Sequence, residues 1–207
     1  AGNTVGAQWA SAQPAKNGLN AGQMLAGDLK AVILLNNEPE FDSAAGAKAK
    51  AVLGQAQMVV SMNPFRANMD FCDVILPISP FTETSGSFVN AEGRLQSFHA
   101  VVKPLGETRP AWKVLRVLAN MLDLPGFDFD ASTDVLSKLT GQSTALSSIP
   151  ADKLGNLSSA AFDMSAATTR PVTATIYQVD GIVRRASSLQ MTADAKMPTT
   201  SADEVNA

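Results

Sequence analysis

Three short apolar runs, each bounded by residues that break secondary structure, constrain the fold most. They cover residues 29–35, 57–62 and 74–78. Each run has the length and composition of a strand that is buried on both faces. An Ala/Lys-rich segment of good helix formers, residues 44–56, separates the first run from the second. Because a strand, a helix and a strand with short connections favour parallel pairing through a right-handed crossover, the sequence predicts an α/β fold with a mainly parallel sheet flanked by helices.

Further elements follow from periodicity and from helix-capping residues. Residues 109–122 carry a broad apolar stripe at helical spacing, which Pro125-Gly126 ends. Polar residues that can cap a helix are placed as follows: Asn20 before 21–26, Ser43 before 44–56, and Ser132 or Thr133 within 127–139. A helix within 151–162 and a late strand over 171–179 are also predicted. The polar tail beyond Gln190 is expected to be disordered.

The chain divides into three parts by composition and periodicity. Residues 1–140 are expected to form the α/β domain, residues 141–170 are a Ser/Ala-rich segment with poor periodicity, and residues 171–207 are a C-terminal strand and docking tail. At 207 residues the chain can bury roughly 70% of its unfolded surface, which is enough for a core without disulfides. One domain, or one domain with a small appendage, is therefore expected.

A long loop joins the third apolar run to the helix at 109–122. Apolar residues are spaced through it, so we expect it to be ordered and functional or structural in role. It carries a characteristic order of residues: Asp73-Val74-Ile75-Leu76-Pro77, Glu83, Gly86, Asn90, Glu92-Gly93-Arg94, Gln96, Pro104, Gly106-Glu107, Arg109 and Trp112. This order resembles the molybdopterin oxidoreductase superfamily. Within it, the nearest resemblance is to the large iron-sulfur subunit of bacterial NADH-quinone oxidoreductase, respiratory complex I. The segments 2–7 and 176–187 also resemble parts of that subunit, the second its C-terminal tail.

The resemblance implies a fold similar to part of the cofactor-binding region of molybdopterin oxidoreductases. It further implies an excised scaffold domain of a complex I peripheral-arm subunit, which supports electron transfer from NADH to quinone without carrying a redox centre or acting as a catalyst by itself. The expected partners are other peripheral-arm subunits and the upstream part of the same subunit, where iron-sulfur clusters are expected. The expected location is the cytoplasmic side of the bacterial inner membrane. The alternative is part of the dinucleotide site of an active, formate dehydrogenase-like molybdopterin oxidoreductase.

Composition excludes several other classes. A net charge of −3 and a pI near 5.1 argue against a nucleic-acid partner, which requires clustered Lys and Arg. No apolar run approaches the ~20 residues of a transmembrane helix, so no direct membrane insertion is expected. Cys72 is the only cysteine, so the chain cannot supply the four thiolates of an iron-sulfur cluster. No cofactor and no metal are therefore expected within this chain.

Polar residues follow the first two predicted strands, where open α/β sheets place ligands. Glu38, Glu40 and Asp42 can act as acid and base or hold a divalent cation, but a solvated turn is the favoured interpretation. Asn63 and Arg66 follow the second strand. Together with Asn90 and Arg94, they are the cofactor-binding candidates under the alternative function; no Gly-rich phosphate motif accompanies them.

Five charged residues of the long loop form the main candidate constellation: Glu83, Glu92, Arg94, Glu107 and Arg109. Arg94 can act as a bidentate clamp for an anion. The favoured interpretation is that the Glu and Arg side chains pair and hold the loop against the sheet, because a phosphate site requires an excess of positive charge.

No catalytic residue is predicted. His99, the only histidine, is expected to be structural, since no orienting carboxylate or nucleophile is indicated. Cys72 is expected to be a buried free thiol. Arg184-Arg185, between apolar residues near the end, predicts a segment that docks on another subunit or on the upstream domain.

Overall fold

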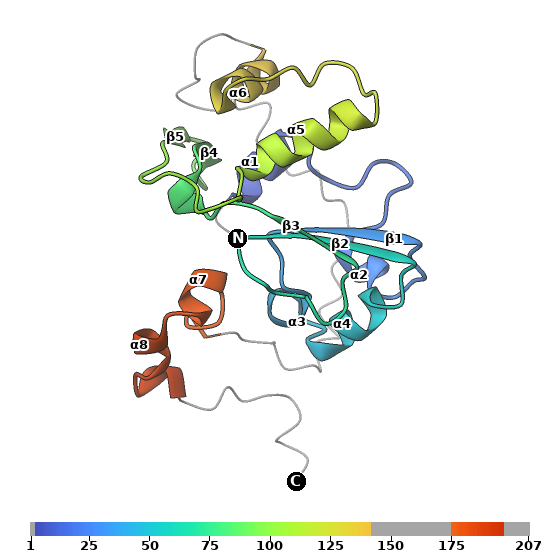
Figure 1. Ribbon diagram of the computed structural model, residues 1–207, viewed down its shortest axis with the longest axis vertical. Coiled ribbons are helices and arrows are strands. Elements are labelled where there is room, and N and C mark those ends of the chain that lie inside the picture. Colours follow the sequence, from blue (N-terminus) through green and yellow to red (C-terminus); the bar gives the residue numbers. More distant parts are fainter. Residues whose placement is uncertain (1–2, 142–174, 197–207) are drawn as a thin grey trace.

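A parallel three-stranded sheet forms the centre of the computed structural model, which describes residues 3–141 and 175–196. Its strands β1 (Ala31–Leu35), β2 (Met58–Asn63) and β3 (Val74–Pro77) lie side by side in that order (Figure 1). All pairing in this sheet is parallel, with Ala31 opposite Met58 and Val60 opposite Val74. The predicted α/β class and parallel sheet are confirmed.

The strands are not equally buried. The central strand β2 holds the fully buried side chains of Val59, Ser61 and Met62. The edge strand β1 alternates instead: Val32 and Leu34 are buried, whereas Ile33 is 56% exposed. The prediction that this strand is buried on both faces is wrong for the described part of the chain, because β1 has a neighbouring strand on only one side and the main core lies against only one of its faces. The same prediction is wrong for the other edge strand, β3, which has no buried residue.

Short helices accompany the first strands. They are α1 (Thr4–Trp9), α2 (Ala21–Met24), α3 (Pro39–Asp42) and α4 (Ala47–Leu53). As predicted, Asn20 caps α2, and Gln23 completes the capping box. Ser43 does not cap α4; Gly46 occupies that position, and the Ser43 hydroxyl accepts from the Ala45 N–H instead. Leu53 of α4 packs into the core formed with β1 and β2.

The long loop contains a hairpin that the sequence did not predict. Strands β4 (Gly86–Val89) and β5 (Leu95–Phe98) pair antiparallel after a short 3-10 turn, η1 (Phe81–Glu83). Val89 and Leu95 form a second small core with residues of α1 and α6. The prediction that the long loop has an ordered structure is therefore confirmed.

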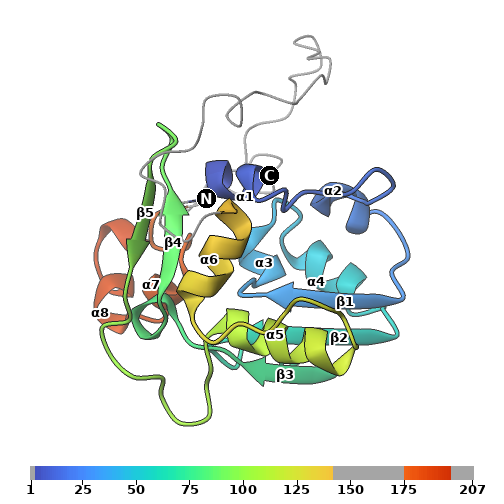
Figure 2. The ribbon, with the colours of Figure 1, turned by 90° about the horizontal axis from the view of Figure 1, so that it is seen from above.

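Two longer helices follow the hairpin. Helix α5 (Ala111–Met121) lies on the opposite side of the sheet from α4, and α6 (Ser132–Thr140) lies beyond it (Figures 1 and 2). The cap of α6 is not Ser132 or Thr133. Ala131 is the N-cap, and the Asp134 carboxylate accepts from the Ala131 N–H at 2.8 Å.

The C-terminal region folds as short helices: α7 (Gly181–Arg184), α8 (Ser187–Gln190) and the 3-10 turn η4 (Asp194–Lys196). Residues 175–180 form turns, so the predicted strand over 171–179 is wrong in its described part. The disorder expected beyond Gln190 is also wrong as far as Lys196, which ends η4. The helix predicted within 151–162 lies outside the described residues. In the part of the chain that the structure describes, no helix combines the length and apolar character needed to cross a membrane.

Candidate functional site at the carboxyl edge of the sheet

The three parallel strands end at one edge of the sheet, and a pocket of about 420 Å³ lies there. The loops after β1, β2 and β3 supply one side of its lining, and the segment around α7 supplies the other. In Figures 1 and 2 the strands end on the side of the molecule where α7 lies. The lining residues are Asn36, Asn37, Glu38, Asp42, Pro64, Phe65, Pro80, Phe81, Val179, Asp180, Gly181, Ile182 and Arg184.

Two asparagines fix the loops at this edge of the sheet. Asn36 has a φ of 48° and donates its N–H to the Met62 carbonyl at 2.8 Å, so the chain turns sharply where β1 ends. Asn68, with a φ of 64°, donates its side-chain amide to the Asn37 carbonyl and to the Ser61 hydroxyl. Asn tolerates this left-handed backbone better than most residues, because its short polar side chain bonds locally. The loops after β1 and β2 are thereby tied together.

The most notable feature of the edge is an ionic cluster, here called the carboxylate clasp, formed by Glu38, Asp42, Arg184 and Arg185. Arg185 binds Glu38 with both ends of its guanidinium, at 2.8 Å and 3.0 Å. Arg184 Nη1 donates to Asp42 at 3.0 Å, and its Nη2 lies 3.3 Å from Glu38. The side chains of Glu38 and Arg184 are only 8% and 7% exposed. The solvated turn predicted here is therefore wrong for Glu38, which is buried and paired; Glu40 is exposed and lies 4.0 Å from Lys50.

The charges around Glu38 explain why its buried carboxylate stays ionised. Burial raises the pKa of Glu38, but the hydrogen bonds and charges of Arg185 and Arg184 outweigh burial and hold the pKa below its ordinary value. Asp42 also accepts the Glu38 backbone N–H at 2.7 Å, which fixes the turn after β1. Glu38 is consequently an ionised hydrogen-bond acceptor at neutral pH, without the raised pKa that a general acid requires.

Aromatic rings complete the clasp and the pocket. The guanidinium of Arg184 lies 4.9 Å from the centre of the Phe41 ring, and that of Arg185 lies 4.1 Å from the centre of the Phe65 ring. These contacts are within the range of cation–π attraction. Phe81 lines the pocket and is 58% exposed, so its ring remains available to a ligand.

The predicted cofactor-binding candidates fall into two separate places. Asn63 ends β2 and is buried, with its side-chain oxygen accepting the Phe65 N–H, and Arg66 is exposed in the same loop. Asn90 and Arg94 lie in the turn between β4 and β5, where Asn90 Oδ1 accepts the Arg94 N–H at 2.8 Å. The structure does not bring the four together, and none of them lines the pocket at the sheet edge.

The loop constellation is brought together only in part. Glu83 accepts the Leu105 N–H at 2.9 Å, which ties the two ends of the long loop, and Arg109 lies 3.9 Å from Glu107 in an exposed pair. Glu92 and Arg94 are exposed in the hairpin turn, and within residues 3–141 and 175–196 they form no ion pair with each other. The predicted Glu–Arg network is therefore wrong as one cluster, although Glu83 does organise the loop.

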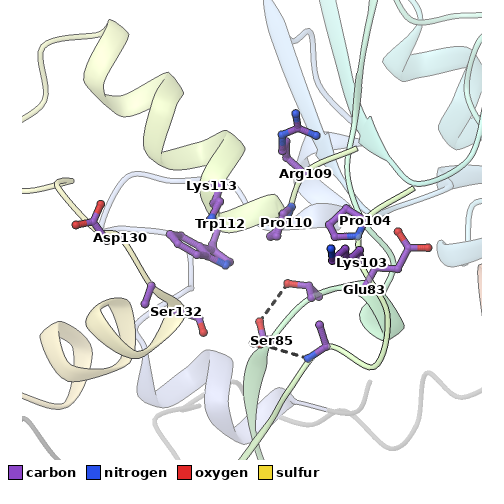
Figure 3. A pocket seen from close by; sticks show the side chains of 13 residues that line it. Glu83, Ser85, Lys103, Pro104, Arg109, Pro110, Trp112, Lys113, Asp130 and Ser132 are labelled. Atoms are coloured by element: carbon purple, nitrogen blue, oxygen red, sulfur yellow. Dashed lines mark hydrogen bonds between the residues drawn. The ribbon is translucent and has the colours of Figure 1, made fainter. Parts of the chain in front are cut away.

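A second, more open pocket of about 580 Å³ lies where the long loop meets the starts of α5 and α6. Figure 3 shows Glu83, Lys103, Pro104 and Arg109 along one part of it and Trp112, Asp130 and Ser132 along another. The cations Lys103, Arg109 and Lys113 are exposed, and Lys113 lies 5.3 Å from the Trp112 ring. The pocket has a mixed charge and an aromatic wall, but no buried polar group among its described lining residues points to a ligand there.

The remaining candidates have no catalytic environment. His99 is exposed after β5. Cys72 is half-buried against the main core, and burial raises the pKa of its thiol, so it stays protonated at neutral pH. In the described ranges of the chain, no group of His, Cys, Asp and Glu side chains is arranged to hold a metal ion.

Sequence reasoning missed the carboxylate clasp because its two halves are 147 residues apart. The sequence predicts that Arg184 and Arg185 dock on another subunit or an upstream domain; in the structure they dock on this chain's own sheet. The available signal was complementary charge: an acidic run after the first strand and an adjacent pair of arginines near the end.

A parallel sheet whose strands end at one ligand-sized pocket is the arrangement that nucleotide-binding α/β domains use. Comparison with known proteins identifies the family. Residues 1–121, more than half of the chain, match the family model described as Molybdopterin oxidoreductase. The chain belongs to the molybdopterin oxidoreductase family.

Individual proteins of this family are also similar to the chain. A putative formate dehydrogenase of Staphylococcus aureus (strain bovine RF122 / ET3-1) is 42% identical over 73 residues, which cover 35% of this chain and 7% of that protein. The probable oxidoreductase YjgC of Bacillus subtilis (strain 168) is 26% identical over 163 residues, covering 76% of this chain and 16% of that protein. The chain therefore spans only a small part of the length of these relatives. Among solved structures, acetylene hydratase from Pelobacter acetylenicus gives a TM-score of 0.47 at 16% identity, over 59% of this chain and 19% of that one.

Proposed function

We propose that this chain is a part of a formate dehydrogenase-like molybdopterin oxidoreductase and that its sheet edge holds the nucleotide end of a molybdopterin dinucleotide. The pocket across the carboxyl ends of β1, β2 and β3 carries this proposal, because its sheet walls all lie within the residues that match the family. The similarity to putative formate dehydrogenases supports the same branch.

The chemistry of the pocket fits the base and sugar of a nucleotide better than its phosphates. Both arginines of the clasp are already paired with carboxylates, so the lining has no surplus positive charge for a diphosphate. The exposed Phe81 ring offers a stacking surface for a base. The amide side chains of Asn36 and Asn37 and the Asp180 carboxylate line the same space and can exchange hydrogen bonds with a base or a ribose. The exposed Arg66, in the loop after β2, is the candidate for a phosphate contact.

The redox chemistry is assigned to the rest of the enzyme. A bound molybdopterin would supply the metal centre, and this chain would orient the cofactor by its distant nucleotide. The partner of this surface is then the remainder of the same polypeptide. The complex I interpretation, with its peripheral-arm partners, its quinone reaction and its place at the inner membrane, receives no support from the relatives described above and stays a prediction.

The test uses the native-length polypeptide that contains this chain, purified from its source. Mild acid hydrolysis of a molybdopterin dinucleotide breaks its diphosphate and releases a nucleoside monophosphate, which chromatography quantifies. We expect about one nucleotide per polypeptide, and we expect Phe81→Ala to lower its retention about tenfold, since base stacking on an aromatic ring contributes roughly 1–3 kcal/mol. Phe88→Ala is the matched control: Phe88 is similarly exposed, but it lies on β4 outside the pocket.

Two results would contradict the proposal. One is a wild-type protein that releases no nucleotide and carries no pterin. The other is equal nucleotide retention in Phe81→Ala, Phe88→Ala and the wild type.

A further inference from the structure

We infer that the C-terminal segment 178–190, here called the strap, forms one wall of the nucleotide pocket. Glu38, Arg184 and Arg185 are the positioning residues that hold the strap in this place. This inference rests on the proposed function, because it names a further part of the same site. Val179, Asp180, Gly181 and Ile182 of the strap line the pocket directly. Glu38 and Arg184 also line the pocket, and together with Arg185 they hold these four residues in place.

Ion pairs with the buried carboxylate of Glu38 attach the strap to the edge of the sheet. Arg185 and Arg184 converge on the two oxygens of Glu38, and Arg184 also reaches Asp42. Because Glu38 lies in the turn that follows β1, the contact fixes the strap relative to the edge of the sheet. Phe41 and Phe65 lie against the two guanidinium groups and limit their movement.

The strap also has an internal structure that makes it a firm wall. The Asp180 carboxylate caps α7 by accepting the N–H groups of Ile182 and Val183. The Gln190 side-chain amide donates to the Tyr177 and Val183 carbonyls at 3.0 Å and 2.8 Å. These bonds fold the segment on itself, so the clasp positions one unit rather than a loose tail.

Close approach at Gly181 shows how tightly the strap meets the sheet. A Cβ atom added at this residue would lie 3.1 Å from Glu38 Oε1, 3.5 Å from the Phe65 ring and 3.6 Å from Arg185 Nη1. A side chain of any size here pushes against the clasp itself. A Cβ atom at this position would therefore require Glu38 or the strap to shift by a few tenths of an ångström.

The clasp is incomplete in one respect. Arg184 Nε is buried and has no hydrogen-bond partner among the described residues, although the other guanidinium nitrogens of Arg184 are bonded. A buried ionic cluster with an unsatisfied donor contributes little net stability compared with an apolar contact of the same shape. Its value lies in conformational specificity: it fixes where the strap lies. Breaking it is thus expected to release the strap while the sheet, whose core lies elsewhere, stays folded.

The experiment compares Glu38→Gln with Glu40→Gln in the native-length polypeptide. Glu40 lies two residues further on in α3, is exposed and does not line the pocket, so it is the matched control. Trypsin cleaves after Arg184 and Arg185, and this cleavage reports strap release without reference to the cofactor. Retained nucleotide, released by acid hydrolysis, reports the pocket. We expect Glu38→Gln to raise the rate of cleavage in the strap about tenfold or more and to lower nucleotide retention, with no change in Glu40→Gln.

Gly181→Ala gives a second, independent variant that leaves every charge in place, and the same two changes are expected in it. Unchanged cleavage in both Glu38→Gln and Gly181→Ala would overturn the clasp. Faster cleavage with undiminished nucleotide would overturn the positioning role. A wild-type protein with a protected strap and no nucleotide would overturn the proposed function and the positioning role with it, while the clasp as a structural contact would stand.

Discussion

Removal of the Glu38 charge is the perturbation whose size follows most directly from the structure. In Glu38→Gln the amide keeps the shape of the side chain but loses the ionic contacts to Arg185 at 2.8 Å and 3.0 Å and to Arg184 at 3.3 Å. Breaking a fully buried pair by removing one partner costs about 3–5 kcal/mol. Since the Arg185 side chain is 36% exposed, water compensates part of this loss, and we take about 2–3 kcal/mol for strap release.

This free energy corresponds to a rise of roughly 30- to 150-fold in the open population of the strap, at 1.4 kcal/mol for each factor of ten. Amide hydrogen exchange measures it. The reporters are the Ile182 and Val183 N–H groups, which are bonded to the Asp180 carboxylate, and the Arg184 N–H, which is bonded to the Asp180 carbonyl. Because a helix of four residues is marginal by itself, these bonds are expected to open once the strap leaves the sheet. Exchange at these amides is therefore expected to accelerate by up to that factor, while amides of the central strand β2 are unchanged. Equal exchange of the strap amides in the variant and the wild type would refute the reasoning, as would uniform acceleration in β2.

Three further predictions concern pH and stability. Because the pKa of Glu38 is lowered on folding, the stabilisation from the clasp is present above its ordinary value of 4.5 and is lost as pH falls through the lower folded value. The protection factors of the strap amides, which are exchange rates relative to the unfolded chain at the same pH, should therefore fall there in the wild type and stay constant in Glu38→Gln. Met62→Ala leaves a cavity in the fully buried centre of β2 and should lower the free energy of unfolding by about 2–5 kcal/mol in urea titration; a loss below about 1 kcal/mol would contradict the burial. The Asp73 carboxylate accepts the Val59 N–H at 2.7 Å and so joins the start of β3 to β2. Asp73→Asn weakens this bond and should lower the free energy of unfolding by about 1–2 kcal/mol in the same titration. The control Asp123→Asn, at the exposed end of α5, should change it little.

The parallel sheet could be predicted because its signal is local. Each strand is a short apolar run with a breaker at its end, and residues 44–56 between the first two supply a helix that allows parallel pairing. The one-sided burial of β1 could not be predicted in the same way. Ile33 and Leu35 are as apolar as Val32 and Leu34, so composition gives no indication of which face the core covers.

The hairpin β4–β5 was missed for a different reason. Its strands have four residues each, and Ser, Gly and Gln within them weaken the alternation that marks a strand. Asn90 and Gly93 form the turn between them: Asn90 Oδ1 accepts from the Glu92 and Arg94 N–H groups, and Gly93 has a φ of 80°. The sequence suggests loop or ligand positions for these residues, whereas their role in the structure is turn geometry.

The candidate site was predictable in place but not in composition. Polar residues that follow the first two predicted strands lie at the edge of the sheet where the pocket is, and Glu38 and Asp42 line it, although the sequence favours a solvated turn for them. Their partners were not identified, because an ion pair across 147 residues leaves no local pattern. The second wall of the pocket therefore required the three-dimensional structure.

A structure of the native-length polypeptide with its cofactor tests the central claim most directly. We predict that the nucleotide base lies within about 4 Å of Phe81 and of strap residue Ile182, with Glu38 bonded to Arg185 as described. A cofactor whose nucleotide binds elsewhere, with this sheet edge filled by other protein, would contradict the proposed site.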